Sequence, residues 1–373
     1  MRDCLLWGLV FTFVLVGCGE SSTSTRLGDW TMKTGEGSLT KTLEVSETKA
    51  FYFGAIVDMD VTADGRMVVA DRKAKNLKIL GPDGSLIDTL GGPGEGPGEF
   101  QSLMTVQVAR GDSVYAYDYR QARMTVFAPS EPYSVARNVT ISGDHGFAIY
   151  LMLVGDTFVG AFSTGIGSPD EGVHSASPRM WRLVRSTGTP ADTLLQARRG
   201  KMAITAIGDG FRLWMVPFTR TTKVRDGPDA RLYYGWNDSL HIKARTVSGE
   251  RETIANIPAP SVPVSEAARD SAVAAVDENM RSLVASAIPD TKPAFTDFIV
   301  GHDGRVWVQR PATGVDAEKV SWWILDPAEK TISKVRLPRE MDVEVVRKGQ
   351  VYGSTTTEMG APAVVRYRIA EES

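Results

Sequence analysis

GGPGEGPGEF, the stretch from Gly91 to Phe100, holds five glycines and two prolines in ten residues. Glycine and proline at this density disfavour both helix and strand, so the stretch is predicted to be a shaped loop. On both sides of the loop a similar unit recurs, made of a turn with Asp and Gly, an apolar strand that ends in Asp, and a further apolar strand. The loop therefore joins two repeats of a β-rich architecture.

Four short apolar segments precede the loop, separated by turns rich in Asp and Gly: AIVDMDV, RMVVAD, NLKIL and SLIDTL within residues 55–90. The pattern returns after a shift of roughly 47 residues, a period typical of propeller blades, in TVQVARGDSVYAYDYRQARMTVFAP from Thr105 to Pro129. Later echoes begin at Gly155, Gly208 and His302. Four antiparallel strands in meander order form one propeller blade, so the body is predicted to be all-β.

A resemblance to a known family rests on residues 68–100, VVADRKAKNLKILGPDGSLIDTLGGPGEGPGEF, which look like an NHL-type repeat. From about Trp30 onward the chain resembles the bacterial six-bladed β-propeller lipoproteins that are built from such repeats. The match is loose from Phe147 to Glu252 and firms again at residues 292–308 and 320–338. The resemblance implies a six-bladed β-propeller.

One segment departs from the strand pattern. Residues 265–288 carry apolar side chains at helical spacing, with Asp277 and Arg281 four residues apart, and prolines bound the segment on both sides. One amphipathic helix, inserted between blades at about residues 264–288, is predicted here. The remaining length suits six blades, and a strand within Thr40–Phe53 is left over to pair with the segment Ala363–Ile369 and close the ring.

The N-terminus predicts export and a lipid anchor. An apolar run from Leu5 to Val16 has the length of a signal-peptide core, and Leu15-Val16-Gly17-Cys18 resembles the lipobox of bacterial lipoproteins. An ordinary signal peptide with an incidental cysteine is the alternative. The predicted organisation is a signal peptide at 1–17, a flexible tether at 18–39 and the propeller at 40–373. Lipidated Cys18 would hold the protein on the periplasmic face of the cell envelope, at the outer membrane.

Composition excludes several classes of function. The formal net charge of -3, from 42 Lys and Arg against 45 Asp and Glu, disfavours nucleic-acid binding. The only two cysteines are Cys4 and Cys18, so the body has no thiol for a disulfide, a zinc site or a nucleophile. The protein is predicted to be a monomer.

The candidate binding motifs each have a structural interpretation. The glycine-rich loop lacks the Lys-Ser/Thr and the following helix of a phosphate-binding loop, which favours an architectural role. The strand-end carboxylates Asp71, Asp118 and Asp326 either cap the next turn through backbone N–H groups, the favoured interpretation, or face a channel.

The other candidates for chemistry are scattered. The four histidines, His145, His174, His241 and His302, fall in different repeats without a second ligand at metal spacing, and no serine has a nucleophile-elbow context. Six tryptophans are predicted to be core between blades, with an aromatic ligand groove as the alternative: Trp181, Trp214, Trp236, Trp307, Trp322 and Trp323. Adjacent Trp322 and Trp323 point to opposite faces of a strand, so both are buried only if both faces are covered.

These observations favour a non-enzymatic binding or scaffold module for an envelope protein, peptide or glycan. No catalytic residue, metal ligand or cofactor is assigned, and the ligand-binding residues are unknown at this stage. The alternative is a lactonase-like hydrolase or lyase with a divalent cation in the channel, because propellers can assemble ligands from several blades at their centre. Fold alone does not decide between them.

Overall fold

The computed structural model of the protein describes residues 24–129, 131–163, 170–208, 210–313 and 318–370. The predicted signal peptide and Cys18 lie outside these residues. Within the described residues no helix is long and apolar enough to cross a membrane.

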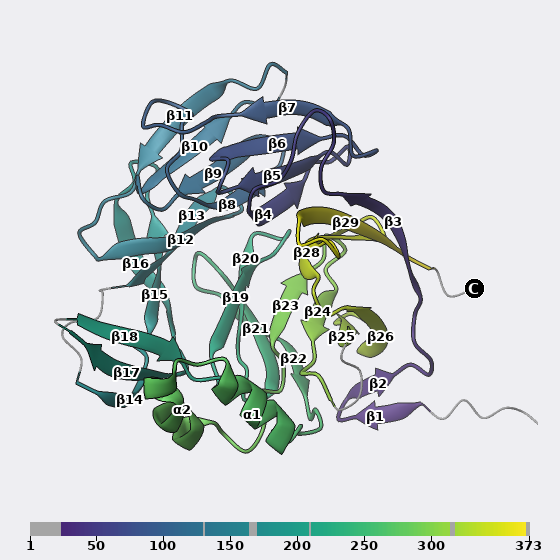
Figure 1. Cartoon of the computed structure of the whole chain (residues 1–373). Helices are drawn as coiled ribbons and strands as arrows, with labels where there is room; N and C mark the ends of the chain where they lie inside the picture. Colours follow the sequence, from purple (N-terminus) through teal and green to yellow (C-terminus); the bar gives the residue numbers. More distant parts are fainter. Residues whose placement is uncertain (1–23, 130, 164–169, 209, 314–317, 371–373) are drawn as a thin grey trace, which may run out of the picture.

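The strands pair into antiparallel sheets in sequence order (Figure 1). The first sheet is β4 (Ile56–Val61), β5 (Met67–Asp71), β6 (Asn76–Leu80) and β7 (Leu86–Leu90). The second is β8 (Leu103–Val108), β9 (Val114–Asp118), β10 (Arg123–Phe127) and β11 (Val135–Thr140). The third is β12 (Phe147–Val154), β13 (Thr157–Ser163), β15 (Arg179–Val184) and β16 (Pro190–Ala197).

The second half of the chain repeats this arrangement. The fourth sheet is β19 (Thr222–Asp226), β20 (Arg231–Trp236), β21 (Leu240–Thr246) and β22 (Arg251–Ile257). The fifth is β23 (Asp297–Val300), β24 (Val306–Gln309), β25 (Lys319–Asp326) and β26 (Thr331–Pro338). The last is β27 (Asp342–Arg347), β28 (Gln350–Thr356), β29 (Pro362–Ile369) and β3 (Leu39–Val45), and β3 comes from the other end of the chain.

The first strand of each of these sheets lies at the centre of the molecule. Along the described chain β4, β8, β12, β19, β23 and β27 contact one another in that order, and β27 returns to β4. The apolar core lies between neighbouring sheets: Trp322 packs between the fifth and last sheets, whereas Trp323 packs between the fourth and fifth. Both faces of that sheet are therefore covered, as the adjacent tryptophans require, and the fold is propeller-like.

The two ends of the chain meet in the last sheet, as predicted. β3 pairs antiparallel with β29, in a register that places Val45 opposite Val364 and Leu39 opposite Ile369. An unpaired edge exposes backbone groups that favour aggregation. Pairing with β3 removes one edge of β29 and joins the N-terminal segment to the C-terminal sheet.

The predicted flexible tether is wrong over its described part. β1 (Thr25–Leu27) and β2 (Trp30–Met32) form a hairpin, and β2 adds to the outer edge of β26 in parallel. Trp30 and Met32 are buried in the core between the fourth and fifth sheets. The polar composition near residue 20 does not extend to these two apolar side chains, whose burial orders the segment.

The predicted single helix is instead two helices joined by a short 3₁₀ turn: α1 (Glu266–Ala274), η1 (Glu278–Met280) and α2 (Arg281–Ala287). Asp277 forms an ion pair with Arg212 and not with Arg281, which donates to the carbonyl of Val276 at 3.1 Å. A straight helix of 24 residues would be about 36 Å long. The break lets α1 fold back on α2, and α2 lies against the short sheet described next.

The helices cover a three-stranded sheet, and the repeat echo that begins at Gly208 falls in this sheet and not in one of the six ring sheets. The sheet consists of β14 (Gly172–Ser175), β17 (Lys201–Ile207) and β18 (Gly210–Met215). α2 contacts β14 and β17, and Met280 and Val284 are buried against Ala203. This insertion lies to one side of the central space (Figure 1).

The glycine-rich loop is architectural, as predicted. It connects the first and second sheets, and Phe100 is fully buried in the core between them. Gly91 and Gly98 adopt φ of 79° and 80°, a conformation that favours glycine. Arg123 on β10 donates to the carbonyls of Glu95 and Gly96, at 2.9 Å each, and thereby ties the loop to the second sheet.

Candidate functional site

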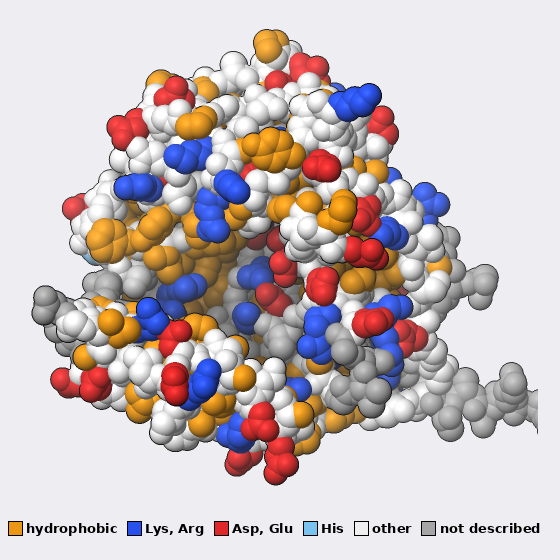
Figure 2. All heavy atoms as spheres, in the orientation of Figure 1, with side chains coloured by type: hydrophobic (Ala, Val, Ile, Leu, Met, Phe, Trp, Pro, Cys, Tyr) orange, Lys and Arg blue, Asp and Glu red, His pale blue; other side chains and the backbone are white. Residues whose placement is uncertain are grey.

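A cavity of about 960 Å³ occupies the centre of the molecule. Residues from all six inner strands line it, and charged and polar side chains lie there among apolar ones, whereas the intersheet cores are apolar. Figure 2 shows the hollow from one side, with acidic and basic side chains both present in its walls. Convergence of polar groups from many sheets at one place makes this cavity the candidate site.

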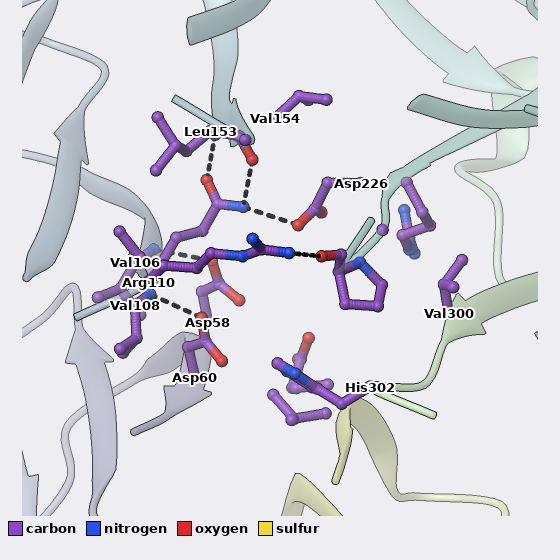
Figure 3. Close-up of a pocket in the computed structure, with 18 of the residues that line it drawn as sticks. Asp58, Asp60, Val106, Val108, Arg110, Leu153, Val154, Asp226, Val300 and His302 are labelled. Atoms are coloured by element: carbon purple, nitrogen blue, oxygen red, sulfur yellow. Dashed lines mark hydrogen bonds between the residues drawn. The ribbon is translucent and has the colours of Figure 1, made fainter. Parts of the chain in front are cut away.

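Two aspartates on β4 hold the neighbouring strand β8 (Figure 3). Asp58 accepts a hydrogen bond from the backbone N–H of Val106 at 2.8 Å, and Asp60 accepts one from Val108 at 2.7 Å. The innermost strand of a sheet is an edge strand, and its inward-facing N–H groups need partners. The two carboxylates supply those partners and thereby fix the spacing of the first two sheets.

Farther around the ring, other side chains also bridge neighbouring inner strands. Gln107 on β8 pairs with the backbone of Leu153 on β12 and donates to the carboxylate of Asp226 at 3.0 Å. At the mouth, Arg110 donates to the carbonyl of Pro228 at 3.2 Å (Figure 3). Gln107 therefore connects three sheets through one amide.

Charged groups complete the ring. Arg225 on β19 donates to Asp297 on β23 at 2.7 Å, and Arg347 on β27 donates to the carbonyl of Val61 on β4 at 2.7 Å. These contacts hold the cavity wall in place before any ligand arrives. Preorganisation of this kind lowers the entropy lost on binding.

Enclosure by protein shifts the titration of the cavity carboxyls. Burial raises the pKa of Asp60 to about 7, against the two backbone N–H groups that it accepts from. Burial also raises the pKa of Glu344 to about 7. The pKa of Asp58 lies well above its usual value because of burial first and the charge of Glu344 second. Near neutral pH Asp60 and Glu344 can therefore both accept and donate protons.

Across the part of the chain that the structure describes, no group of three or more His, Cys, Asp or Glu side chains is placed to hold a metal ion. The cavity carboxylates are spread over several strands, and two of them are occupied by backbone N–H groups.

The strand-end aspartates predicted from the sequence lie away from the cavity and act as caps. Asp71 accepts from the backbone N–H groups of Gly54 and Ala55, at 2.7 and 3.0 Å, and from Lys78 at 2.9 Å. In the turn that follows each strand, Asp71 accepts from the backbone N–H of Ala74, Asp118 from that of Gln121, and Asp326 from those of Ala328 and Glu329. The capping interpretation is confirmed for all three.

The histidines and tryptophans singled out in the sequence lie partly in the cavity wall and partly in the core. Only His302 lines the cavity, where it lies exposed at the mouth (Figure 3), and the other three histidines are not among the lining residues. Four of the six tryptophans are buried core residues, as predicted, whereas two are only half-buried: Trp214 and Trp236.

Apart from His302, the residues that line the cavity were not among the sequence candidates. A signal was present, because Asp58 and Asp60 alternate with apolar residues on one strand, as do Asp342 and Glu344 on another. Residues two apart share one face of a strand. Polar pairs at this spacing at the start of successive repeats indicate inner strands that line a common channel.

No family model matches the chain, and no curated protein sequence matches it. Solved structures do resemble it. A predicted exported protein of Bacteroides fragilis has 10% sequence identity and a TM-score of 0.55, over 89% of this chain and 96% of that one. A member of the DUF4221 family from Bacteroides vulgatus has 8% identity and a TM-score of 0.50, over 91% and 100%.

A streptogramin B lyase is also similar, with 12% identity, a TM-score of 0.42, and coverage of 89% of this chain and 98% of that one. At these identities the likeness concerns the fold and not the activity. The chain is therefore similar in fold to the exported protein and to the DUF4221 member.

Proposed function

We propose that the protein is a lipid-anchored binding module of the bacterial cell envelope, a six-bladed propeller with NHL-type repeats that takes part of a protein, peptide or glycan into its central cavity. The observation that carries the proposal is the preorganised polar cavity. Its volume of about 960 Å³ suits a ligand segment of several residues or sugars. The blade count is supported by the six inner strands that contact one another in a ring within the described residues.

The chemistry of the wall favours a polar ligand. Asp58, Asp60 and Gln107 are engaged in holding strands together, whereas Glu344 has no hydrogen bond within the described residues and His302 lies at the mouth. The side chains of Glu344 and His302 are therefore free to contact a ligand without loosening the ring. The cavity therefore separates supporting side chains from those available for recognition.

The membrane anchor is a separate element of the proposal. Cys18 follows a lipobox-like sequence, and acylation there would hold the protein on a membrane surface without a spanning helix. We expect Cys18→Ser protein to be unprocessed or to leave the membrane fraction. Fractionation of cells that express the variant, with a blot for the processed form, checks this. Processed variant that remains with the membrane contradicts the anchor.

Site-specific photocrosslinking tests the cavity as the binding site. A benzophenone amino acid replaces Arg110, at the cavity mouth, in the full acylated protein within intact envelopes. The matched control carries the same group at Met359, which is 90% exposed and does not line the cavity. We expect a defined adduct at position 110 that is absent at position 359. Equal labelling at both positions, or none at position 110, contradicts the proposal.

One observation favours the enzyme alternative. Asp60 and Glu344 have pKa values of about 7, which suits general acid or base catalysis. A lactonase-like hydrolase or lyase with a channel cation requires saturable binding of a divalent ion. Calorimetric titration with Ca²⁺, Mg²⁺ and Zn²⁺ separates the two functions: we expect no saturable heat, and a single site that Asp58→Asn removes would favour the enzyme.

A further inference from the structure

A second cavity of about 450 Å³ adjoins the central one. Tyr150 and Arg225 line both cavities, so the two spaces share part of one wall. The second cavity is built from the third sheet, from β19 and from the segments that lead into and out of the three-stranded insertion. The two cavities are therefore neighbours, and Tyr150 and Arg225 lie between them.

The charge of the second cavity is one-sided. Four cationic side chains line it, namely Arg179, Arg199, Lys223 and Arg225, and no Asp, Glu or His is among its described lining residues. The central cavity has the opposite balance, with six Asp and Glu side chains against three Arg and one His. The second cavity is therefore the more basic of the two, and Tyr150 lies in the wall of both.

The cations of the second cavity are incompletely compensated. Lys223 and Arg225 share one carboxylate, that of Asp297, at 3.8 and 2.7 Å. Among the described residues, the one hydrogen-bond partner of the Arg199 guanidinium is the thioether of Met215, at 3.7 Å, and a thioether is a weak acceptor. The guanidinium of Arg179 has no hydrogen bond or ion pair with any described residue, and its Nε is shielded from solvent.

This arrangement costs stability when the cavity is empty. Burial first, and the charge of Arg199 second, lower the pKa of the Arg179 guanidinium, which means that the folded protein disfavours that charge. Structural arginines are usually satisfied by a carboxylate or by carbonyls. A half-buried, unpartnered guanidinium beside a second one indicates a place for an anion that arrives with a ligand.

We propose that the second cavity binds a carboxylate of the ligand, and that the ligand is a peptide whose free C-terminus lies between Arg179 and Arg199. This inference rests on the proposed function, because the rest of the peptide would occupy the central cavity. A peptide with free ends is a zwitterion, and its ammonium group suits the carboxylates around Glu344. The edge-to-face pair of Tyr150 and Trp181, with centroids 6.0 Å apart, gives the ligand an apolar surface between the two charged spaces.

A paired peptide library tests the carboxylate site. Tripeptides with free C-termini and the same tripeptides as C-terminal amides are incubated with the protein, and bound species are measured by native mass spectrometry. We expect the free acids to bind at least tenfold more tightly, since a charge-assisted contact contributes on the order of one tenfold step or more. Inorganic phosphate is titrated in a separate arm. If phosphate binds at Arg179 while the free acids and the amides bind equally well, the site is a phosphate site and the peptide proposal is overturned.

Variants of two arginines on strand β15, Arg179 and Arg182, provide the test and its control. Arg179→Gln should remove the preference for the free acid, and Arg179→Lys should retain part of it. Arg182→Gln is the matched control, because Arg182 lies on the same strand β15, also has a shielded Nε without a partner, and does not line the cavity. If Arg182→Gln loses the preference for the free acid as Arg179→Gln does, the proposal is contradicted.

Thermal stability gives a second readout. A ligand-binding Arg179 predicts that Arg179→Gln keeps or raises the melting temperature, because an uncompensated charge is removed. A structural arginine predicts a lower one, and that result overturns the assignment. If free acids and amides bind alike while the photocrosslink at position 110 persists, the carboxylate site fails and the binding function stands. If, in addition, no defined adduct forms at position 110, the proposed function fails.

Discussion

Asp71 and Glu344 are both enclosed by protein, yet their pKa values move in opposite directions. Burial acts to raise the pKa of Asp71, but hydrogen bonds from Ala74, Gly54 and Lys78 more than offset it and leave the pKa lowered. Glu344 has no comparable set of donors, and burial raises its pKa to about 7. The partners of a carboxylate therefore separate a capping residue from one available to a ligand.

Glu344 is the residue for which pH dependence is sharpest. Its pKa is raised in the folded state from 4.5 to about 7, so the folded protein holds a proton that the unfolded chain has lost, and stability falls as pH rises through that window. We expect Glu344→Gln to raise the free energy of unfolding at pH 8 by about 1–3 kcal/mol and to have little effect at pH 4.5.

Denaturant unfolding at the two pH values measures this difference. Glu340→Gln is the control, because Glu340 is exposed. An effect of Glu344→Gln that is the same at both pH values would show that its charge is not disfavoured in the fold.

At the scale of an element, the glycine-rich loop acts through a few of its positions. A Cβ on Gly91 would lie 2.4 Å from the carbonyl oxygen of Gly98 and 2.5 Å from the ring of Phe100. A Cβ on Gly96 would meet only the flexible end of the Glu99 side chain, at 3.0 Å, and Gly96 is not at positive φ. The need for glycine therefore lies at Gly91 and not at Gly96.

Substitutions in the loop should follow this order. Phe100→Ala should lower stability by about 3–5 kcal/mol, because it empties a fully buried site, and Gly91→Val should lower it by more than about 1 kcal/mol. Gly96→Val and Glu95→Gln should change little. Thermal melts with circular dichroism check the order, and a Gly91→Val protein that melts with the wild type would contradict it.

At the scale of the whole molecule, β29 joins the chain ends. It pairs with β28 on one side and with β3 on the other, so its loss separates the N-terminal strand from the ring and exposes two edges at once. Adjacent sheets share their apolar cores. Disruption of one sheet is therefore expected to reach its neighbours.

Deletion of residues 363–373 should destabilise the entire domain in one transition. Calorimetry of the truncated protein measures this, with deletion of residues 371–373 alone as the control. A truncation that melts at the wild-type temperature, or in two separate steps, would show that the sheets are independent.

Local patterns determined the elements whose signals lie within a few residues. The four strands of the first sheet, the turn caps at Asp71 and Asp118, and the loop anchored by Phe100 all follow from alternation and turn chemistry. The pairing of β3 with β29 was also predictable, because a leftover strand at one end matched an incomplete sheet at the other.

Tertiary structure alone decided which side chains meet. Asp58, Gln107, Arg225 and Glu344 come from four different strands, and nothing in their local sequence states that these strands share one channel. The fold-back at Val276 likewise depends on a sheet formed by strands far earlier in the chain. Burial and charge are properties of the assembled neighbourhood, so the cavity carboxylates and the uncompensated Arg179 emerge only when the ring is closed.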